Sequence, residues 1–429
     1  MSKVLLLSLV FAPDGVSTSI LMSELAQELQ EAGHELTVLT TTPHYNVEPE
    51  AVARQPLTPK WNKLLYESSY HGIPVYHAAI PVKGSRVGAR LLDYFRFHAI
   101  STLAALKVAR DCDVILVPSP PLTIGLSAWI LKLLLRVPFI YNVQEIYPDV
   151  AVHLGVLKNK TMIRLLEGLE RFIYRRSHTI TVISERFRQR LLGKGVEARK
   201  LAIIPNFVDT EFVTPQARHN PFSQQQGMDA KFVVLYAGNI GLTQNFETIL
   251  AAAQQLTDLQ DVRFLIVGDG TRREWLETQL SEKGYENVVL LPYQPRSIVP
   301  QIYATSDVCL VPLKRGTGKE TFPSKIYTIM AAKRPVIAAT DPDSELADLV
   351  THADCGWAVQ AEDVDALANA IRTAYQQRDQ LETKAERGYR YVLANHSRQA
   401  VTQQYDLLIR KVVQEEAVED AQQQKLSVS

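Results

Sequence analysis

Short apolar runs alternate with amphipathic helical patterns along most of the chain, and this alternation limits the possible folds more than any other feature. Residues 4–10 and 36–40 are strand-like runs, and residues 20–30 between them carry leucines on one side at helical spacing. The same pattern restarts with strand-like runs at 232–236 and 264–267. Strands that alternate with helices predict a parallel sheet with helices on both faces. We therefore predict an α/β protein.

The length of the chain predicts two domains of this kind. A chain of 429 residues is longer than one hydrophobic core usually holds. The polar run 214–229, with three consecutive glutamines, is typical of a linker. We expect an N-terminal domain over residues 1–205 and a C-terminal domain over residues 206–396. The polar residues 417–429 are expected to form a disordered tail.

Charge and cysteine content exclude several classes of function. Lys plus Arg and Asp plus Glu number 46 each, so the overall charge gives no reason to expect a nucleic-acid partner. The three cysteines have neither metal-ligand nor redox spacing, which is typical of a protein from a reducing cytosol. The chain lacks a dinucleotide fingerprint, a Walker sequence, a metalloprotease motif and a serine-hydrolase elbow. We expect neither a metal ion nor another cofactor.

Residues 313–345 are the most informative segment of the chain. They combine a loop that contains Lys314, Arg315 and Lys319 with a helix that we expect to begin within residues 321–325 and a buried strand. A basic loop that leads into a helix N-terminus is a favourable site for phosphate, because free N–H groups and the helix dipole both attract anions. An ordinary loop–helix–strand unit with solvated lysines explains the segment equally well.

Polar residues also follow strands elsewhere, at the edge where open α/β sheets bind their ligands. Gly15 and a run of hydroxyl residues follow the first strand, Glu145 follows the strand at 138–143, and Gly238 follows the strand at 232–236. Two domains that face each other across a cleft would bring such segments together. Cations suit a diphosphate and carboxylates suit sugar hydroxyls, and transfer of a sugar from a nucleoside diphosphate needs both.

Two further features of the sequence concern possible contact with a membrane. The apolar residues 122–135 contain Lys132 and are too short to cross a bilayer of about 30 Å, so they form either a buried helix or an interfacial one. Arg86, Arg90 and Arg96 alternate with aromatic residues and form either a solvated helix face or a contact with an anionic acceptor or membrane. We expect a cytoplasmic protein that contacts the inner face of the cytoplasmic membrane.

Several short motifs run in a fixed order through nearly the whole chain. They are Phe11-x-Pro13 with Gly15, Gly33-His34-Glu35-Leu36, Gln144-Glu145-x-Tyr147-Pro148, Ile204-Pro205-Asn206-x-Val208-Asp209, Gly268-Asp269-Gly270, Pro323-Ser324-Lys325-Ile326-Tyr327 and Arg334-Pro335-Val336-Ile337. In this order they resemble family 4 of the retaining glycosyltransferases, which have the GT-B architecture of two Rossmann-like, doubly wound parallel-sheet domains facing across a cleft. The motif at 144–148 is most similar to the branch that assembles bacterial surface polysaccharides, including the fucosamine transferases.

The resemblance implies roles for individual residues, and it also has gaps. It implies that Glu320 contacts the donor sugar and that the last helices, from about residue 397, cross back to the first domain. The second glutamate of the family motif falls on Thr328, and the arginine and lysine that clamp the diphosphate fall on Asn239 and Gln244. A histidine of the first domain falls on Gln144. We expect Lys325, with Lys319 or Arg315, to supply the missing positive charge.

The resemblance thus predicts a retaining glycosyltransferase that takes a sugar from a nucleotide diphosphate. The sugar is of the hexosyl or N-acetylhexosaminyl type, and the acceptor is a polysaccharide or a lipid-linked oligosaccharide of the cell surface. A nucleotide-sugar 2-epimerase of the same fold and a non-catalytic partner subunit are the alternatives. The candidate catalytic residues are Glu320, Lys325 and Glu145, and the candidate acceptor or membrane residues are Arg86, Arg90 and Arg96. The candidate donor-binding residues are Gly15, Gly238, Asn239, Gly268, Lys319, Thr321, Phe322, Pro323, Ser324 and Thr328.

Overall fold

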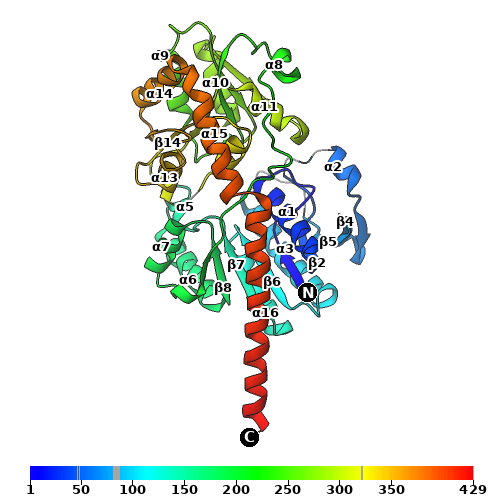
Figure 1. Cartoon of the computed structure of the whole chain (residues 1–429). Helices are drawn as coiled ribbons and strands as arrows, with labels where there is room; N and C mark the ends of the chain where they lie inside the picture. Colours follow the sequence, from blue (N-terminus) through cyan, green and yellow to red (C-terminus); the bar gives the residue numbers. More distant parts are fainter. Residues whose placement is uncertain (46, 48, 81–86, 320–321, 429) are drawn as a thin grey trace. The chain divides into compact units, whose positions relative to one another are not determined.

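The structure, a computed structural model, describes residues 1–45, 47, 49–80, 87–319 and 322–428, except for the side chains of 87–92, 319, 419–421 and 423–428. The chain forms two compact units (Figure 1). The first comprises Met1–Pro148, Lys158–Pro205 and Gln399–Ser429, and the second comprises Asp149–Leu157 and Asn206–Arg398. Residues 149–157, which we expected in the N-terminal domain, therefore belong to the second unit.

The first unit is built on a nine-stranded sheet with the strand order β3-β4-β5-β2-β1-β6-β7-β8-β9. Its strands are β1 (Lys3–Leu7), β2 (Glu35–Thr41), β3 (Thr58–Lys60), β4 (Leu65–Tyr70), β5 (Ile73–Ala78), β6 (Val114–Ser119), β7 (Phe139–Val143), β8 (Thr179–Val182) and β9 (Leu201–Ile203). All neighbours pair in parallel except β3 with β4 and β4 with β5, which are antiparallel.

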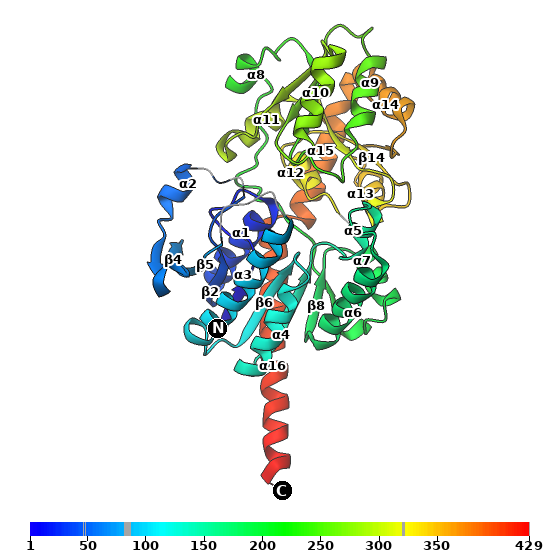
Figure 2. The ribbon, with the colours of Figure 1, turned by 180° about the vertical axis from the view of Figure 1, so that it is seen from behind.

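Helices cover both faces of this sheet. They are α1 (Ser17–Glu31), α2 (Pro49–Arg54), α3 (Val87–Val108), α4 (Ile124–Leu135), α6 (Lys160–Arg176), α7 (Glu185–Gly193) and α16 (Arg398–Val428), with 3-10 turns η1 (Trp61–Lys63) and η2 (Ala198–Lys200). Figure 1 shows α16 in front of β6, β7 and β8, and Figure 2 shows α4 on the opposite face. The chain therefore covers this sheet with its own C-terminal helix.

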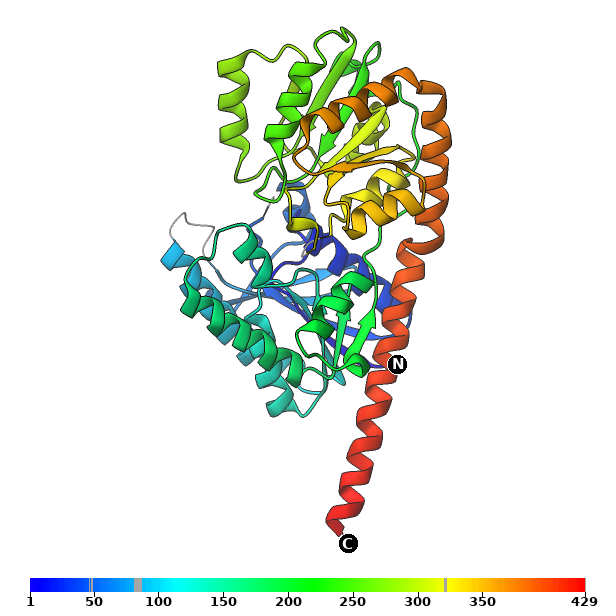
Figure 3. The same cartoon turned by 90° about the vertical axis from the view of Figure 1, so that its left-hand side faces the viewer.

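The last helix is longer than the sequence analysis expected. We expected residues 417–429 to be a disordered tail, but α16 extends through Val428. Its last part continues past the other elements of the first unit (Figure 3). The physical reason is composition, since residues 399–429 contain neither glycine nor proline and are rich in glutamine, which favours helices.

The second unit is built on a six-stranded, fully parallel sheet with the order β12-β11-β10-β13-β14-β15. Its strands are β10 (Phe232–Ala237), β11 (Val262–Val267), β12 (Val288–Leu291), β13 (Val308–Pro312), β14 (Val336–Thr340) and β15 (Gly356–Gln360). Its helices are α5 (Asp149–His153), α8 (Pro221–Gln225), α9 (Phe246–Gln255), α10 (Arg273–Lys283), α11 (Val299–Thr305), α12 (Lys325–Ala331), α13 (Glu345–His352), α14 (Val364–Gln376) and α15 (Arg378–Asn395), with 3-10 turns η3 (Arg296–Ile298) and η4 (Thr317–Lys319).

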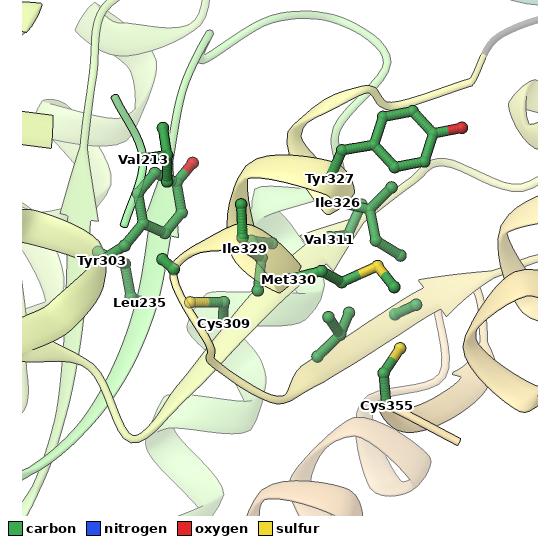
Figure 4. Packing of buried hydrophobic residues seen from close by; sticks show 14 of the residues in the cluster. Val213, Leu235, Tyr303, Cys309, Val311, Ile326, Tyr327, Ile329, Met330 and Cys355 are labelled. Carbon is green, nitrogen blue, oxygen red and sulfur yellow. The ribbon is translucent and has the colours of Figure 1, made fainter. Parts of the chain in front are cut away.

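The core of the second unit lies on both faces of its sheet. Successive residues of a strand point to opposite faces. Accordingly, Val233 and Leu235 of β10 join the cluster beneath α12 and α13, whereas Phe232 and Val234 join the cluster beneath α9 and α14. Figure 4 shows the first cluster, in which Ile326 and other residues of α12 pack toward β13. This packing fixes α12 beside the carboxyl ends of the two central strands.

The segment expected to be a linker is packed against the second unit instead. Arg218 forms an ion pair with Asp307, with Nη2 2.9 Å from Oδ2. Asn220 caps α8 through a reciprocal pair of hydrogen bonds with Ser223, and Phe222 is buried. The polar composition that predicted a linker here reflects this capping and ion pairing.

Candidate functional site

The strand order of the second sheet reverses between β10 and β13. From β10 the chain adds β11 and β12 on one side, and from β13 it adds β14 and β15 on the other. Open α/β sheets bind ligands outside the carboxyl ends of the strands at such a switch point. The two segments that leave these strands are joined, because Lys314 N donates to Thr243 O at 2.9 Å and Asn245 N donates to Pro312 O at 3.2 Å.

Three glycines line this edge, and each has a backbone conformation that L side chains rarely adopt. The φ angles are 138° for Gly238, 153° for Gly268 and 154° for Gly270. A β-carbon on Gly268 would overlap the carbonyl oxygen of Gly238, and one on Gly270 would overlap that of Ile240. The loops after β10 and β11 thus contact each other through their backbones, which leaves a surface that a ligand can approach closely.

The amine of Lys325 reaches the same edge. Its Nζ atom lies 2.8 Å from the position that a β-carbon of Gly238 would occupy and 3.8 Å from the ring centroid of Tyr236. The atom is buried and has no hydrogen-bond partner in the described part of the chain. Burial lowers the pKa of Lys325 to about 7.

Asn239 and Gln244, where the resembled family has its clamp cations, help to shape the loop after β10. Tyr236 donates its hydroxyl hydrogen to the main-chain carbonyl of Asn239 at 2.5 Å. Gln244 accepts from Gly241 N at 3.1 Å and donates to Thr243 Oγ1 at 2.8 Å. In this loop, neither amide brings a positive charge to the edge.

The basic loop after β13 is held in place by hydrogen bonds to residues that follow β14 and β15. Gly316 N donates to both carboxylate oxygens of Asp341, at 3.0 and 2.8 Å. Arg315 donates to the Ala361 carbonyl at 3.4 Å. The side chain of Lys319 lies outside the described residues.

The helix after this loop begins at the last residue of the predicted range 321–325. The helix α12 starts at Lys325, and Ser324, which occupies the N-cap position, makes no capping hydrogen bond through its side chain. Ser324 itself has αR backbone angles, which do not direct a side chain back to the first turn. Pro323 precedes the cap rather than lying in the first turn. A seven-residue helix is a weaker anion site than the sequence suggested.

The other predicted donor residues are only partly described. Glu320 and Thr321 lie outside the described residues. Phe322 stacks on Tyr327 with ring centroids 5.5 Å apart, and Thr328 lies half-buried on α12. The structure therefore brings together Lys325, Gly238, Asn239 and Gly268 at one edge of the second sheet.

In the first unit, Gly15 lies in a loop that is tied to the segment after β2. Gly15 N donates to Tyr45 O at 2.9 Å. The carboxylate Oδ1 of Asp14 accepts from the backbone N of His44 and of Tyr45, both at 2.7 Å. Burial raises the pKa of Asp14. These contacts give the Gly15 loop a fixed conformation at the carboxyl end of β1.

Glu145 follows β7 at the corresponding edge of the first sheet. It is half-buried, and burial raises the pKa of its carboxyl group. Gln144 donates to Asn142 Oδ1 at 2.8 Å, and Asn142 in turn donates to the hydroxyl of Tyr405 on α16 at 2.9 Å. The C-terminal helix thus supports the segment that carries Glu145.

The structure describes only some of the candidate membrane residues. Arg86 and the side chain of Arg90 lie outside the described residues, and Arg96 is half-buried on α3. The helix α4 has both a buried face and an exposed apolar end, where Leu133 and Leu134 are 58% and 57% exposed. Among the described helices, none has the length and apolar character required to cross a membrane.

No group of three or more His, Cys, Asp or Glu side chains suited to a metal ion occurs among the described residues.

The sequence analysis missed two residues that build the edge in the second unit, Tyr236 and Gly270. The signal for Tyr236 was an aromatic residue at the end of a buried strand, two positions before Gly238. The signal for Gly270 was its place in the Gly268-Asp269-Gly270 turn.

Two protein-family models match the chain. Residues 15–206 match the model described as "Glycosyl transferase 4-like domain", and residues 220–391 match the model described as "Glycosyl transferases group 1". The first match includes the strands β2–β9, and the second includes β10–β15.

Two curated proteins are similar along much of the sequence. WcaI of Escherichia coli (strain K12), assigned as a colanic acid biosynthesis glycosyl transferase, is 24% identical over 387 residues, 87% of this chain and 92% of that protein. WbjE of Pseudomonas aeruginosa, assigned as a glycosyltransferase, is 29% identical over 270 residues, 61% of this chain and 66% of that protein.

Solved structures share the fold at lower sequence identity. The sucrose-phosphate synthase of Thermosynechococcus elongatus has a TM-score of 0.75 and 18% identity, covering 96% of this chain and 99% of its own. HepE of Anabaena, solved in complex with UDP and glucose, has a TM-score of 0.71 and 18% identity, covering 96% of this chain and 100% of its own. These likenesses confirm the predicted GT-B fold.

Proposed function

Because the chain belongs to the family 4-like, group 1 glycosyltransferases of GT-B fold, we propose that it transfers a sugar from a nucleoside diphosphate with retention of configuration. The acceptor is a growing polysaccharide or a lipid-linked oligosaccharide of the cell surface. The assignment of WcaI to colanic acid biosynthesis supports this acceptor class. The transferred sugar is a hexose or an N-acetylated amino sugar.

One observation carries the donor part of this proposal. The edge after β10 and β11 combines a glycine-lined backbone surface with the buried amine of Lys325, at the switch point of a parallel sheet. A diphosphate needs close approach to the backbone and a positive charge. The UDP complex of HepE, a protein of the same fold, supports a nucleoside diphosphate as the ligand.

The chemistry assigns different tasks to the candidate residues. The bond between the anomeric carbon and the diphosphate oxygen breaks, and the diphosphate gains negative charge. A cation placed at that oxygen stabilises the transition state more than the ground state. Lys325 fits this task, and Glu320 fits hydrogen bonding to hydroxyls of the donor sugar. The acceptor hydroxyl attacks the anomeric carbon and gives its proton to the leaving diphosphate.

Glu145 belongs to a different part of the reaction. Its carboxyl group lies at the carboxyl edge of the first sheet, and burial raises its pKa. We assign it to hydrogen bonding with the acceptor. Activity that depends on the ionised form of Glu145 rises with pH through this raised pKa, whereas a Glu145→Gln variant loses that rise.

Membrane contact is the remaining part of the proposal. The exposed Leu133 and Leu134 of α4 are followed by Arg136, and Lys132 lies beside them. Burial lowers the pKa of Lys200, and the charges of Lys132, Arg199 and Arg176 lower it further, so these cations lie close together. Leucines surrounded by cations suit the surface of an anionic bilayer. The protein then works at the inner face of the cytoplasmic membrane.

A ligand panel followed by a transfer assay tests the function. UDP, GDP, ADP and their sugar conjugates are compared by thermal shift, since a ligand at 100 times its Kd stabilises a protein by about 2.7 kcal/mol. The conjugate that stabilises most is then incubated with a lipid-linked acceptor extract. Transfer of labelled sugar by the purified chain supports the proposal. Interconversion of the nucleotide sugar without transfer supports the epimerase, and donor binding without turnover supports a non-catalytic subunit.

A further inference from the structure

The surroundings of Lys325 are unusual for a lysine. Its Nζ atom is buried and has no hydrogen-bond partner in the described residues, although lysine ammonium groups are almost always paired when buried. The face of the Tyr236 ring lies 3.8 Å away, and this attracts a cation only weakly compared with a hydrogen-bonded carboxylate. The amine is therefore placed at a functional edge without the partner that a permanent charge requires.

The other titratable groups near α12 do not supply that partner. On β13, burial raises the pKa of the Cys309 thiol to about 12, so it is neutral near pH 7. Tyr236 of β10 and Tyr327 of α12 are buried phenols, and burial raises the pKa of both. The charges of Glu345 of α13 and Tyr391 of α15 raise the pKa of Tyr327 further. The strand β14 contains no titratable residue. Burial therefore dominates, and it lowers the pKa of Lys325 to about 7.

The position of the amine shows what it is available to bind. It occupies the space beside Gly238, where any β-carbon would come within 2.8 Å of it, and Gly238 is the first residue after β10. The main-chain carbonyl of Asn239 and the side-chain amide of Gln244 accept hydrogen bonds that shape the neighbouring loop, and neither residue brings a charge. Lys325 is thus the side chain that can place a positive charge at the edge where the proposed function places a diphosphate.

We propose, resting on the proposed function, that Lys325 is the residue that pairs with the donor diphosphate, and that its amine is neutral in the free protein and takes up a proton when the diphosphate binds. Donor binding is then linked to pH. The free protein at pH 8 holds mostly neutral amine, whereas the complex holds the ammonium ion beside the phosphate oxygens.

The sign of the effect follows from this linkage. Binding is strongest below about pH 7, where the ammonium ion is already present. Above that pH the diphosphate must bind together with a proton, so Kd rises by up to about tenfold for each pH unit. The terminal phosphate of a nucleoside diphosphate titrates at about pH 6, so measurements between pH 7.5 and 9.0 avoid its protonation.

Isothermal titration calorimetry tests the proposal directly. UDP, GDP, ADP and inorganic pyrophosphate are titrated into the full chain at pH 7.5, 8.25 and 9.0, in two buffers with different ionisation enthalpies. The difference in apparent enthalpy between the buffers gives the number of protons taken up. The proposal expects close to one proton per site at pH 8.25 and a Kd that rises with pH.

Three variants make the result specific. Lys325→Met keeps the length of the side chain and removes its charge, so it is expected to weaken binding about 10- to 150-fold at pH 7.5 and to abolish proton uptake. Lys325→Arg stays charged at every pH, so any binding that it retains takes up no proton. Lys283→Met, at an exposed position on α10, is expected to behave as the wild type. Equal binding by Lys325→Met and the wild type overturns the proposal.

Glu320 requires its own variant, because it lies outside the described residues. If Glu320→Gln abolishes proton uptake while Lys325→Met keeps it, the carboxylate is the group that titrates and the proposal is overturned.

Sugar transfer measured beside calorimetry distinguishes failure of the proposed role of Lys325 from failure of the proposed function. Transfer without proton uptake overturns only the role of Lys325. Nucleoside diphosphate binding with proton uptake but no transfer retains the anion site and overturns the glycosyltransferase function. Absence of binding by all four ligands overturns both.

Discussion

At the scale of single residues, the buried amine of Lys325 makes stability depend on pH. Its folded-state pKa of about 7 lies below its usual value of 10.5, so the unfolded chain binds more protons between these values. The wild type is therefore expected to have a smaller free energy of unfolding than Lys325→Met at pH 7. This difference in free energy decreases by up to about 1.4 kcal/mol per pH unit as pH rises toward 10. Urea unfolding of the nucleotide-free variants at pH 7, 8 and 9 measures this. A difference that is constant with pH contradicts the assigned environment.

Gly268 permits a second residue-scale prediction. A β-carbon there would overlap the carbonyl oxygen of Gly238, and φ is 153°. Gly268→Ala is expected to displace the loop after β10 and to weaken nucleoside diphosphate binding at least tenfold. Gly284→Ala is the matched control, because Gly284 also has a positive φ, 62°, but has no atom within 4 Å of its β-carbon position. It is expected to cost about 1 kcal/mol of backbone strain and to leave binding unchanged. Equal effects of the two changes on binding would refute the close approach of the two loops.

The sequence predicted part of this site and missed its geometry. Lys325, Gly238, Asn239 and Gly268 were all identified from motifs and from their places after strands. The burial of the Lys325 amine was not predictable, because it depends on the missing side chain of Gly238, which is distant in sequence. The absence of a capping hydrogen bond at Ser324 was not predictable, since residue type alone does not give the backbone angles that capping requires.

At the scale of elements, the strands with continuous apolar runs were the ones that the sequence predicted. Residues 232–236, 264–267 and 336–339 lie within β10, β11 and β14, which are buried on both faces. The antiparallel edge formed by β3 and β4 was missed, because β3 is three exposed residues and β4 shows no apolar alternation. Short edge strands owe their conformation to pairing rather than to their own sequence.

The exposed end of α4 gives an element-scale prediction. Replacing Leu133 and Leu134 by glutamine is expected to reduce binding to vesicles that contain anionic lipid, because about 60% of each side chain is exposed and available to insert. Neutralising Arg175 and Arg176 at the end of α6, or Arg86, Arg90 and Arg96, is expected to flatten the salt dependence of binding instead. Co-sedimentation at low and high salt measures both. A wild-type protein that ignores anionic vesicles at low salt rules out this contact.

At the scale of the whole molecule, the two units carry their candidate residues at equivalent places. Gly15 and Glu145 follow strands of the first sheet, and Gly238 and Gly268 follow strands of the second. Family resemblance predicted this GT-B architecture, and the family matches and solved structures confirm it. The sugar and the acceptor were not predictable, because they depend on contacts of a few side chains such as Glu320 and Thr328 rather than on the fold.

We propose that sugar transfer takes place at the edge formed by Gly238, Gly268 and Lys325. The most direct measurement compares diphosphate affinity with transfer kinetics for Lys325→Ala and Glu320→Ala. Lys325→Ala is expected to weaken binding of the bare diphosphate and to slow transfer. Glu320→Ala is expected to leave diphosphate affinity nearly unchanged and to lower kcat/KM for the nucleotide sugar about 10- to 150-fold, because it contacts only the sugar. If Glu320→Ala loses diphosphate affinity as severely as Lys325→Ala, or if neither change affects transfer, the site does not lie at this edge.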